Sequence, residues 1–103
     1  MSDRFRITLA QLNPTVGDIE GNALKAFTAW QAGRDAGADL VALPEMFITG
    51  YQVQDLIEKP VFHQTAIAAI EALAVQCADG PALAIGGPWL EGASLYNAYH
   101  ICR

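Results

Sequence analysis

Hydrophobic and polar residues alternate along residues 5 to 12, with apolar side chains at Phe5, Ile7 and Leu9. Alternation with a period of two is typical of a strand that is buried on one face. Residues 13 to 18 include Asn, Pro, Gly and Asp, which favour a turn. The chain therefore begins with a predicted strand that ends in a loop.

The periodicity changes to that of a helix after this loop. Asp18 or Asn22 can cap the helix by accepting hydrogen bonds from its first free N–H groups. Apolar residues recur at intervals of three and four, and Gly37 is suited to the helix end. The apolar face consists of Ala23, Ala26, Phe27 and Trp30. We expect one amphipathic helix before Gly37.

Residues 40 to 43 are apolar without alternation, as in a strand buried on both faces of a parallel sheet. A short helical turn is expected at residues 55 to 57. A second helix is expected from about Val61 to Ala78, because its apolar residues lie on one face.

Residues 82 to 85 predict another doubly buried strand, closed by a plain turn at Gly86-Gly87-Pro88, since no phosphate-binding motif accompanies the glycines. Glu91-Gly92-Ala93 predicts a turn, and residues 94 to 102 predict a strand that pairs with the preceding one as a hairpin. The predicted order is β-α-β-α-β-β, an α/β fold. Doubly apolar strands need a layer on each face. We therefore expect residues 1–103 to be a piece of a longer protein.

Composition supports a packed body and excludes several classes of function. The chain is 52% hydrophobic and 17% charged, with a formal net charge of -5. A nucleic-acid partner would need a basic face. We see no signal peptide and no segment that spans a membrane, so we expect a cytoplasmic protein. The two cysteines form no CxxC pair, so we expect reduced thiols and no metal site.

Glu45 is the strongest candidate for chemistry. It follows Pro44 at the end of the 40–43 strand, with apolar residues on both sides in the sequence. Ligands of open α/β sheets bind beyond the carboxyl ends of the strands, and Pro44 stiffens this end. A partly desolvated carboxylate here suits a general base; a loop-start surface residue or a helix cap is the alternative. We expect Glu45 to be at least half-buried and to point into a cleft.

Other polar and reactive residues favour structural roles. The thiols of Cys77 and Cys102 lie on apolar faces and predict core packing, not nucleophiles. Asn97 is interpreted as a structural hydrogen-bonding residue. The sequence does not decide the roles of four other residues. His63 and His100 are structural or solvent-facing, and Tyr51 and Tyr96 belong to the core or line a pocket.

Three segments together resemble the N-terminal part of the nitrilase or carbon–nitrogen hydrolase superfamily. They are AQLNPTVGD at 10–18, GADL at 37–40 and LPEMFITGY at 43–51. Later segments, DL at 55–56, AIGGP at 84–88 and LYNA at 95–98, are similar to the glutaminase domains of glutamine-dependent NAD+ synthetases.

The resemblance implies an α-β-β-α sandwich with a Glu-Lys-Cys triad. Glu45 matches the general base, and Tyr51 matches a tyrosine that lines the glutamine pocket. Lys25 and Lys59 do not match the family lysine. Cys77 and Cys102 do not match the family cysteine. The resemblance places the family lysine after the last strand of this chain and the nucleophilic cysteine further on. It implies that residues 1–103 are the N-terminal portion of an incomplete domain, which we expect to be inactive alone.

The resemblance also implies partners. Glutamine hydrolysis would supply ammonia to a separate synthetase domain that uses ATP and Mg2+ to amidate deamido-NAD+, in a homo-oligomer. No metal or cofactor is expected within this chain. Two alternatives stay open: another carbon–nitrogen hydrolase such as an aliphatic amidase, and a non-catalytic α/β binding module of flavodoxin type. A flavodoxin-type module would need a phosphate-binding loop after the first strand, and residues 13–17 are a poor match to such a loop.

Overall fold

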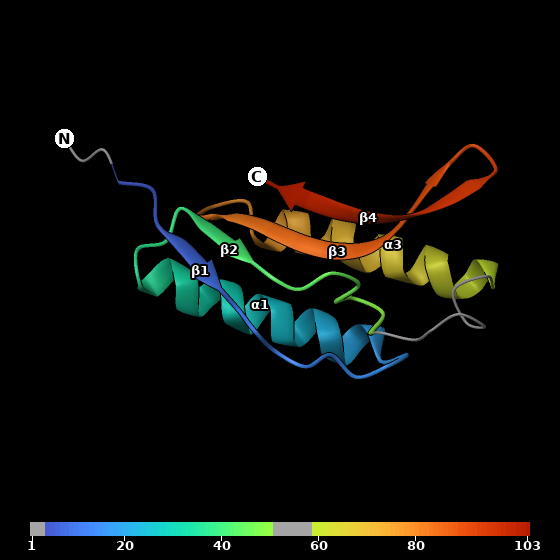
Figure 1. Ribbon diagram of the computed structural model, residues 1–103, viewed down its shortest axis with the longest axis horizontal. Coiled ribbons are helices and arrows are strands. Elements are labelled where there is room, and N and C mark those ends of the chain that lie inside the picture. Colours follow the sequence, from blue (N-terminus) through green and yellow to red (C-terminus); the bar gives the residue numbers. More distant parts are fainter. Residues whose placement is uncertain (1–3, 51–58) are drawn as a thin grey trace.

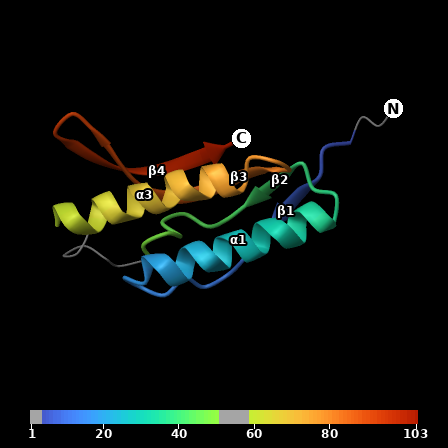
Figure 2. The ribbon, with the colours of Figure 1, turned by 180° about the vertical axis from the view of Figure 1, so that it is seen from behind.

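The computed structural model describes residues 4–50 and 59–103, which form a sheet covered on one face by two helices (Figure 1). The helices lie side by side on that face (Figure 2). Neither helix has the length and apolar content to cross a bilayer, within these residues. The strands are β1 (Ile7–Leu9), β2 (Leu40–Ala42), β3 (Ala82–Glu91) and β4 (Ser94–Cys102), and the helices are α1 (Ile19–Asp35) and α3 (Pro60–Gln76).

The sheet has the order β1-β2-β3-β4, with parallel pairing of β1, β2 and β3 and antiparallel pairing of β3 with β4. One row of residues in register crosses all four strands: Thr8, Val41, Leu83 and Cys102. Val41 and Leu83 are fully buried in this row. The predicted α/β class, the order of elements and the closing hairpin are therefore confirmed.

The two candidate caps of α1 have different roles. Asp18 is the cap, since its carboxylate accepts a hydrogen bond of 3.0 Å from the Gly21 N–H. Asn22 is fully buried and joins two loops instead. Its side chain exchanges hydrogen bonds of 2.8 Å with the Thr15 backbone and donates to the Ile48 carbonyl at 3.1 Å. This side chain therefore fastens the chain before α1 to the segment after β2.

The hydrophobic core lies between the helices and the sheet. Trp30 of α1 packs there, and its indole N–H donates to the Pro81 carbonyl at 2.8 Å. Cys77 and Cys102 are buried and free. Burial, with a smaller contribution from the neighbouring Cys102 thiol, raises the pKa of Cys77 to about 11. The prediction that both thiols are packing residues is confirmed.

The other face of the sheet is open within the part of the chain that the structure describes. Ile7 and Leu9 of β1 and Tyr99 and Ile101 of β4 are at least half exposed on it, at 50 to 71%. The first predicted strand is shorter than expected. Its apolar residues lie on this open face, and Thr8 shares a register row with the buried Val41. The open face is the one that a second layer of a sandwich would cover.

The turn predicted at Gly86-Gly87-Pro88 is wrong. β3 continues through these residues to Glu91, and all three are buried. The turn predicted at residues 91–93 is confirmed as the hairpin turn, where Gly92 has φ +60° and Glu91 pairs with Ser94. The helical turn expected at 55–57 lies outside the described residues.

Candidate active site

The segment that follows β2 is hydrogen-bonded along β3. The Leu43 N–H donates to the Ala84 carbonyl at 2.8 Å, and the Gly86 N–H donates to the Pro44 carbonyl at 3.3 Å. The Ile48 N–H then donates to the Gly86 carbonyl at 3.1 Å. These bonds hold the backbone on both sides of Glu45 against the middle of β3, at the carboxyl end of β2 as predicted.

The two glycines of β3 make this close approach possible. A Cβ added to Gly86 would lie 2.8 Å from the Glu45 Cα and would also meet the Met46 backbone N. A Cβ added to Gly87 would lie 2.7 Å from the Ile48 side chain. Glycine in a strand often marks a place where another backbone approaches closely. Gly86 therefore lets the Glu45 backbone lie against β3, whereas Gly87 leaves room for the side chains of Ile48 and Ile70, and neither glycine belongs to a turn.

The same segment has an unusual backbone that its surroundings enforce. Met46 has φ +53°, a left-handed conformation that non-glycine residues seldom adopt. The Gly50 N–H donates to the Met46 carbonyl at 2.9 Å, and the buried Thr49 hydroxyl donates to the Gly50 carbonyl at 3.1 Å. The Gly17 N–H donates to the Thr49 carbonyl at 2.9 Å. Such over-determined strain is concentrated at functional sites.

Glu45 is exposed, so the expectation of a buried or half-buried carboxylate is wrong for this chain. Glu45 is exposed because its side chain points the opposite way from its buried neighbours. Phe47 and Ile48 turn into the core, whereas Glu45 turns toward β4 on the open face. Its Oε1 accepts a hydrogen bond of 2.9 Å from Nδ2 of Asn97. The two residues line a shallow open hollow together with Leu43, Ala98 and Tyr99.

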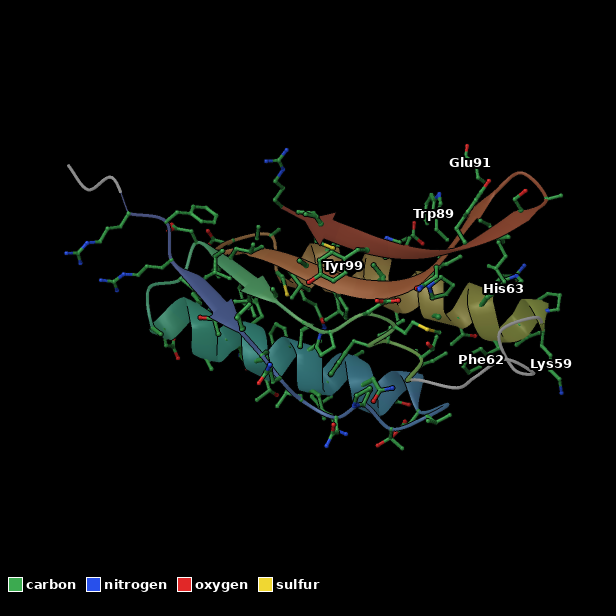
Figure 3. All side chains as sticks on the ribbon, in the orientation of Figure 1. Lys59, Phe62, His63, Trp89, Glu91 and Tyr99 are labelled. Carbon is green, nitrogen blue, oxygen red and sulfur yellow. The ribbon has the colours of Figure 1, made fainter. Side chains whose placement is uncertain are left out.

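Tyr99, which lies on β4 as Asn97 does, holds the segment that carries Glu45. It stands on the open face (Figure 3), and its hydroxyl donates to the Leu43 carbonyl at 2.8 Å. Burial raises the pKa of Tyr99, so the hydroxyl stays protonated as a donor. Sequence reasoning missed Tyr99. The available signal was the strand period, which puts residues 97 and 99 on one face of β4.

A second cavity, of about 170 Å³, borders this hollow. It is lined by Met46, Thr49, Gly87, Pro88, Leu95, Tyr96 and Asn97. Tyr96 is therefore a pocket-lining residue, a role that the sequence left open. Pockets that bind small molecules usually have volumes of about 300 to 1,000 Å³. The cavity accordingly has the size of part of a binding site.

Comparison with known proteins identifies the family. Residues 6–101 match the carbon-nitrogen hydrolase family. The chain belongs to this family. It is 65% identical over 103 residues to the glutamine-dependent NAD(+) synthetase of Rhodobacter capsulatus, which covers 100% of this chain and 19% of that protein. The chain thus spans about a fifth of the length of this relative.

Solved structures agree on the fold of this carbon–nitrogen hydrolase segment. The glutamine-dependent NAD(+) synthetase from Cytophaga hutchinsonii matches with a TM-score of 0.87 at 30% identity, covering 94% of this chain and 17% of that one. An amidase from Nesterenkonia sp. matches with a TM-score of 0.78 at 23% identity, covering 94% and 37%. The second likeness concerns the fold alone. The resemblance seen in the sequence is confirmed.

The other residues weighed as catalytic partners of the carbon–nitrogen hydrolase triad lie elsewhere. The Lys25 ammonium donates to the Asn13 carbonyl at 3.1 Å and to the Thr15 hydroxyl at 3.3 Å. Lys59 stands at the start of α3 (Figure 3), and both thiols are in the core. None of these groups lines the hollow at Glu45.

Three further residues whose roles the sequence left undecided are Tyr51, His63 and His100. Tyr51 lies outside the described residues. His63 is buried on α3, and His100 meets Trp89 edge-to-face with ring centroids 5.9 Å apart. Within residues 4–50 and 59–103, no group of three His, Cys, Asp or Glu side chains could hold a metal ion.

Proposed function

We propose that this chain is the N-terminal portion of a glutaminase domain in a glutamine-dependent NAD+ synthetase, with Glu45 as the general base. The observation that carries the proposal is the placement of Glu45. Its backbone is seated on Gly86, and its carboxylate is held by Asn97 on the open face of the sheet. The 65% identity to the Rhodobacter capsulatus synthetase supports this reading.

The open face gives the carboxylate access to groups from the rest of the protein. A second layer packed on this face would bring a lysine and a cysteine toward Glu45, and would remove water from the hollow. Glu45 takes the proton from the thiol, and the thiolate attacks the side-chain amide carbon of glutamine. Fixed donors, with the lysine among them, stabilise the charge that develops on the amide oxygen.

The remaining steps use the same carboxyl group. The C–N bond breaks, and Glu45 returns its proton so that ammonia leaves a thioester. A water molecule then gives a proton to Glu45 and its hydroxide oxygen to the thioester carbon. The C–S bond breaks and Glu45 passes that proton to the sulfur, which releases glutamate and restores the thiol and the carboxylate. We place Tyr51 at the wall of the glutamine pocket. This chain holds one of the three catalytic groups and is inactive without the others.

In the proposed protein the ammonia serves a second reaction. A separate domain, using ATP and Mg2+, amidates deamido-NAD+. We propose that the protein is a cytoplasmic homo-oligomer. An aliphatic amidase would share the fold, as the Nesterenkonia structure does, but no observation here favours that substrate.

The test is the activity of the full-length protein with two nitrogen sources. We expect deamido-NAD+ to be amidated with glutamine and with ammonium salt, and glutamate to accumulate in step with NAD+. Hydrolysis of simple aliphatic amides without any amidation of deamido-NAD+ would overturn the proposal in favour of an amidase.

A further inference from the structure

Asn97 makes the one side-chain hydrogen bond to the Glu45 carboxylate among the residues that the structure describes. Its Nδ2 lies 2.9 Å from Oε1, across 52 positions of sequence. An ionised carboxylate only accepts hydrogen bonds, so the Asn97 amide must present its nitrogen. The contact engages Oε1 and so sets the direction of the whole carboxylate.

The position of Asn97 is itself set by the sheet. Asn97 pairs with Pro88 in the β3–β4 ladder, and Tyr99 pairs with Gly86. The two side chains share one face of β4 and reach the same segment after β2. Tyr99 holds the backbone at Leu43, whereas Asn97 holds the side chain of Glu45.

The segment does not need Asn97 to adopt its path. Its backbone is already fixed by bonds from Leu43, Gly86 and Ile48 along β3. An exposed glutamate side chain still has rotatable bonds of its own, and a general base must stand within hydrogen-bond reach of the proton it removes. What the backbone bonds leave unfixed is the direction of the carboxylate.

We propose that Asn97 is a positioning residue that orients the Glu45 carboxylate for proton transfer. This inference rests on the proposed function. It assigns Asn97 a task beyond the structural hydrogen bond that the sequence predicts. Because Asn97 also borders the second cavity, the test must separate orientation of the base from binding of substrate.

The experiment compares Asn97→Ala, Asn97→Asp and the control Ser94→Ala in the full-length protein. Ser94 is exposed on the same strand, outside both hollows. A misplaced catalytic group can cost about a hundredfold. We expect Asn97→Ala to lower kcat with glutamine by roughly 10- to 100-fold, with the KM for glutamine and the ammonium-driven rate unchanged. Asn97→Asp, which repels the carboxylate, should lose more, and Ser94→Ala should match the wild type.

A double variant decides whether Asn97 acts through Glu45. If it does, adding Asn97→Ala to Glu45→Gln causes no further loss. Losses that multiply, a changed KM with unchanged kcat, or equal loss with both nitrogen sources would each overturn the inference. The wild type separates the two proposals. A wild type that shows no glutamine-driven activity overturns the proposed function, whereas an active wild type with a fully active Asn97→Ala overturns only the role of Asn97.

Discussion

Gly86 and Glu45 are in such close backbone contact that a Cβ at position 86 would lie 2.8 Å from the Glu45 Cα. Residue 86 belongs to β3, and residue 45 belongs to the segment that follows β2. The contact fixes the distance between the sheet and the backbone of Glu45, the candidate base. It also explains why β3 carries a glycine in its buried middle, where a side chain would otherwise pack.

Gly86→Ala should therefore lower both stability and glutamine-driven activity. The added methyl group meets backbone atoms, which cannot rotate away, and overpacking of this kind typically costs about 1–3 kcal/mol. Hydrogen exchange of peptides that cover residues 40–50, in the full-length protein, measures the local loss. The glutamine-driven rate should fall while the ammonium-driven rate is kept.

Gly92→Ala is the matched control for this substitution. Gly92 has open space around it but a φ of +60°, so alanine there should cost about 1 kcal/mol through backbone strain alone. We expect its glutamine-driven rate to equal that of the wild type. A Gly86→Ala protein with full glutamine-driven activity would show that the seat on β3 does not position the base.

Asn22→Ala should loosen the same segment from the opposite side. The substitution removes the hydrogen bond to the buried Ile48 carbonyl, and an unsatisfied buried group costs about 1–3 kcal/mol. It also removes two bonds to the backbone of Thr15, which is exposed, so that water can replace them. We expect faster hydrogen exchange in peptides that contain Thr15 and Ile48. Asn13→Ala, at an exposed residue, should change the local free energy by less than about 0.5 kcal/mol. Equal exchange rates in the two variants would argue against the bridging role.

Cys77 should make stability fall in alkaline solution. Because burial raises its pKa from 9.0 to about 11, the folded state holds the thiol proton where the unfolded state releases it. The proton difference favours the unfolded state as the pH rises from about 9 to 11. Local opening in α3, followed by hydrogen exchange, should thus become easier across this range, and less so in Cys77→Ala. A thiol reagent that labels native Cys77 at pH 8 as fast as a free peptide would contradict its burial.

Periodicity in the sequence was sufficient for the main elements, because helices and doubly buried strands have distinct apolar patterns. α1, β2 and α3 lie close to where those patterns put them. The path of β3 could not be predicted in the same way. A glycine pair signals either a turn or a close backbone approach, and the choice depends on a segment 40 residues away.

The place of the candidate site in the fold could be predicted, but the environment of Glu45 could not. Pro44 and the strand end located Glu45 correctly, yet apolar neighbours in sequence do not tell which way a side chain turns. Leu43, Phe47 and Ile48 are buried, whereas Glu45, which lies between them in the sequence, is exposed. The partner of Glu45 was hidden for a related reason, since Asn97 reaches it only through the pairing of β4 with β3.

The most direct test of the central claim is the rate of deamido-NAD+ amidation by full-length Glu45→Gln, measured with glutamine and with ammonium salt. Loss of a general base typically slows a reaction by about 10² to 10⁴-fold. We predict a loss of this size with glutamine and an unchanged rate with ammonium, while Glu71→Gln, at an exposed residue of α3, matches the wild type with both. Full glutamine-driven activity of Glu45→Gln, or equal loss with both nitrogen sources, would contradict the assignment of Glu45 as the base.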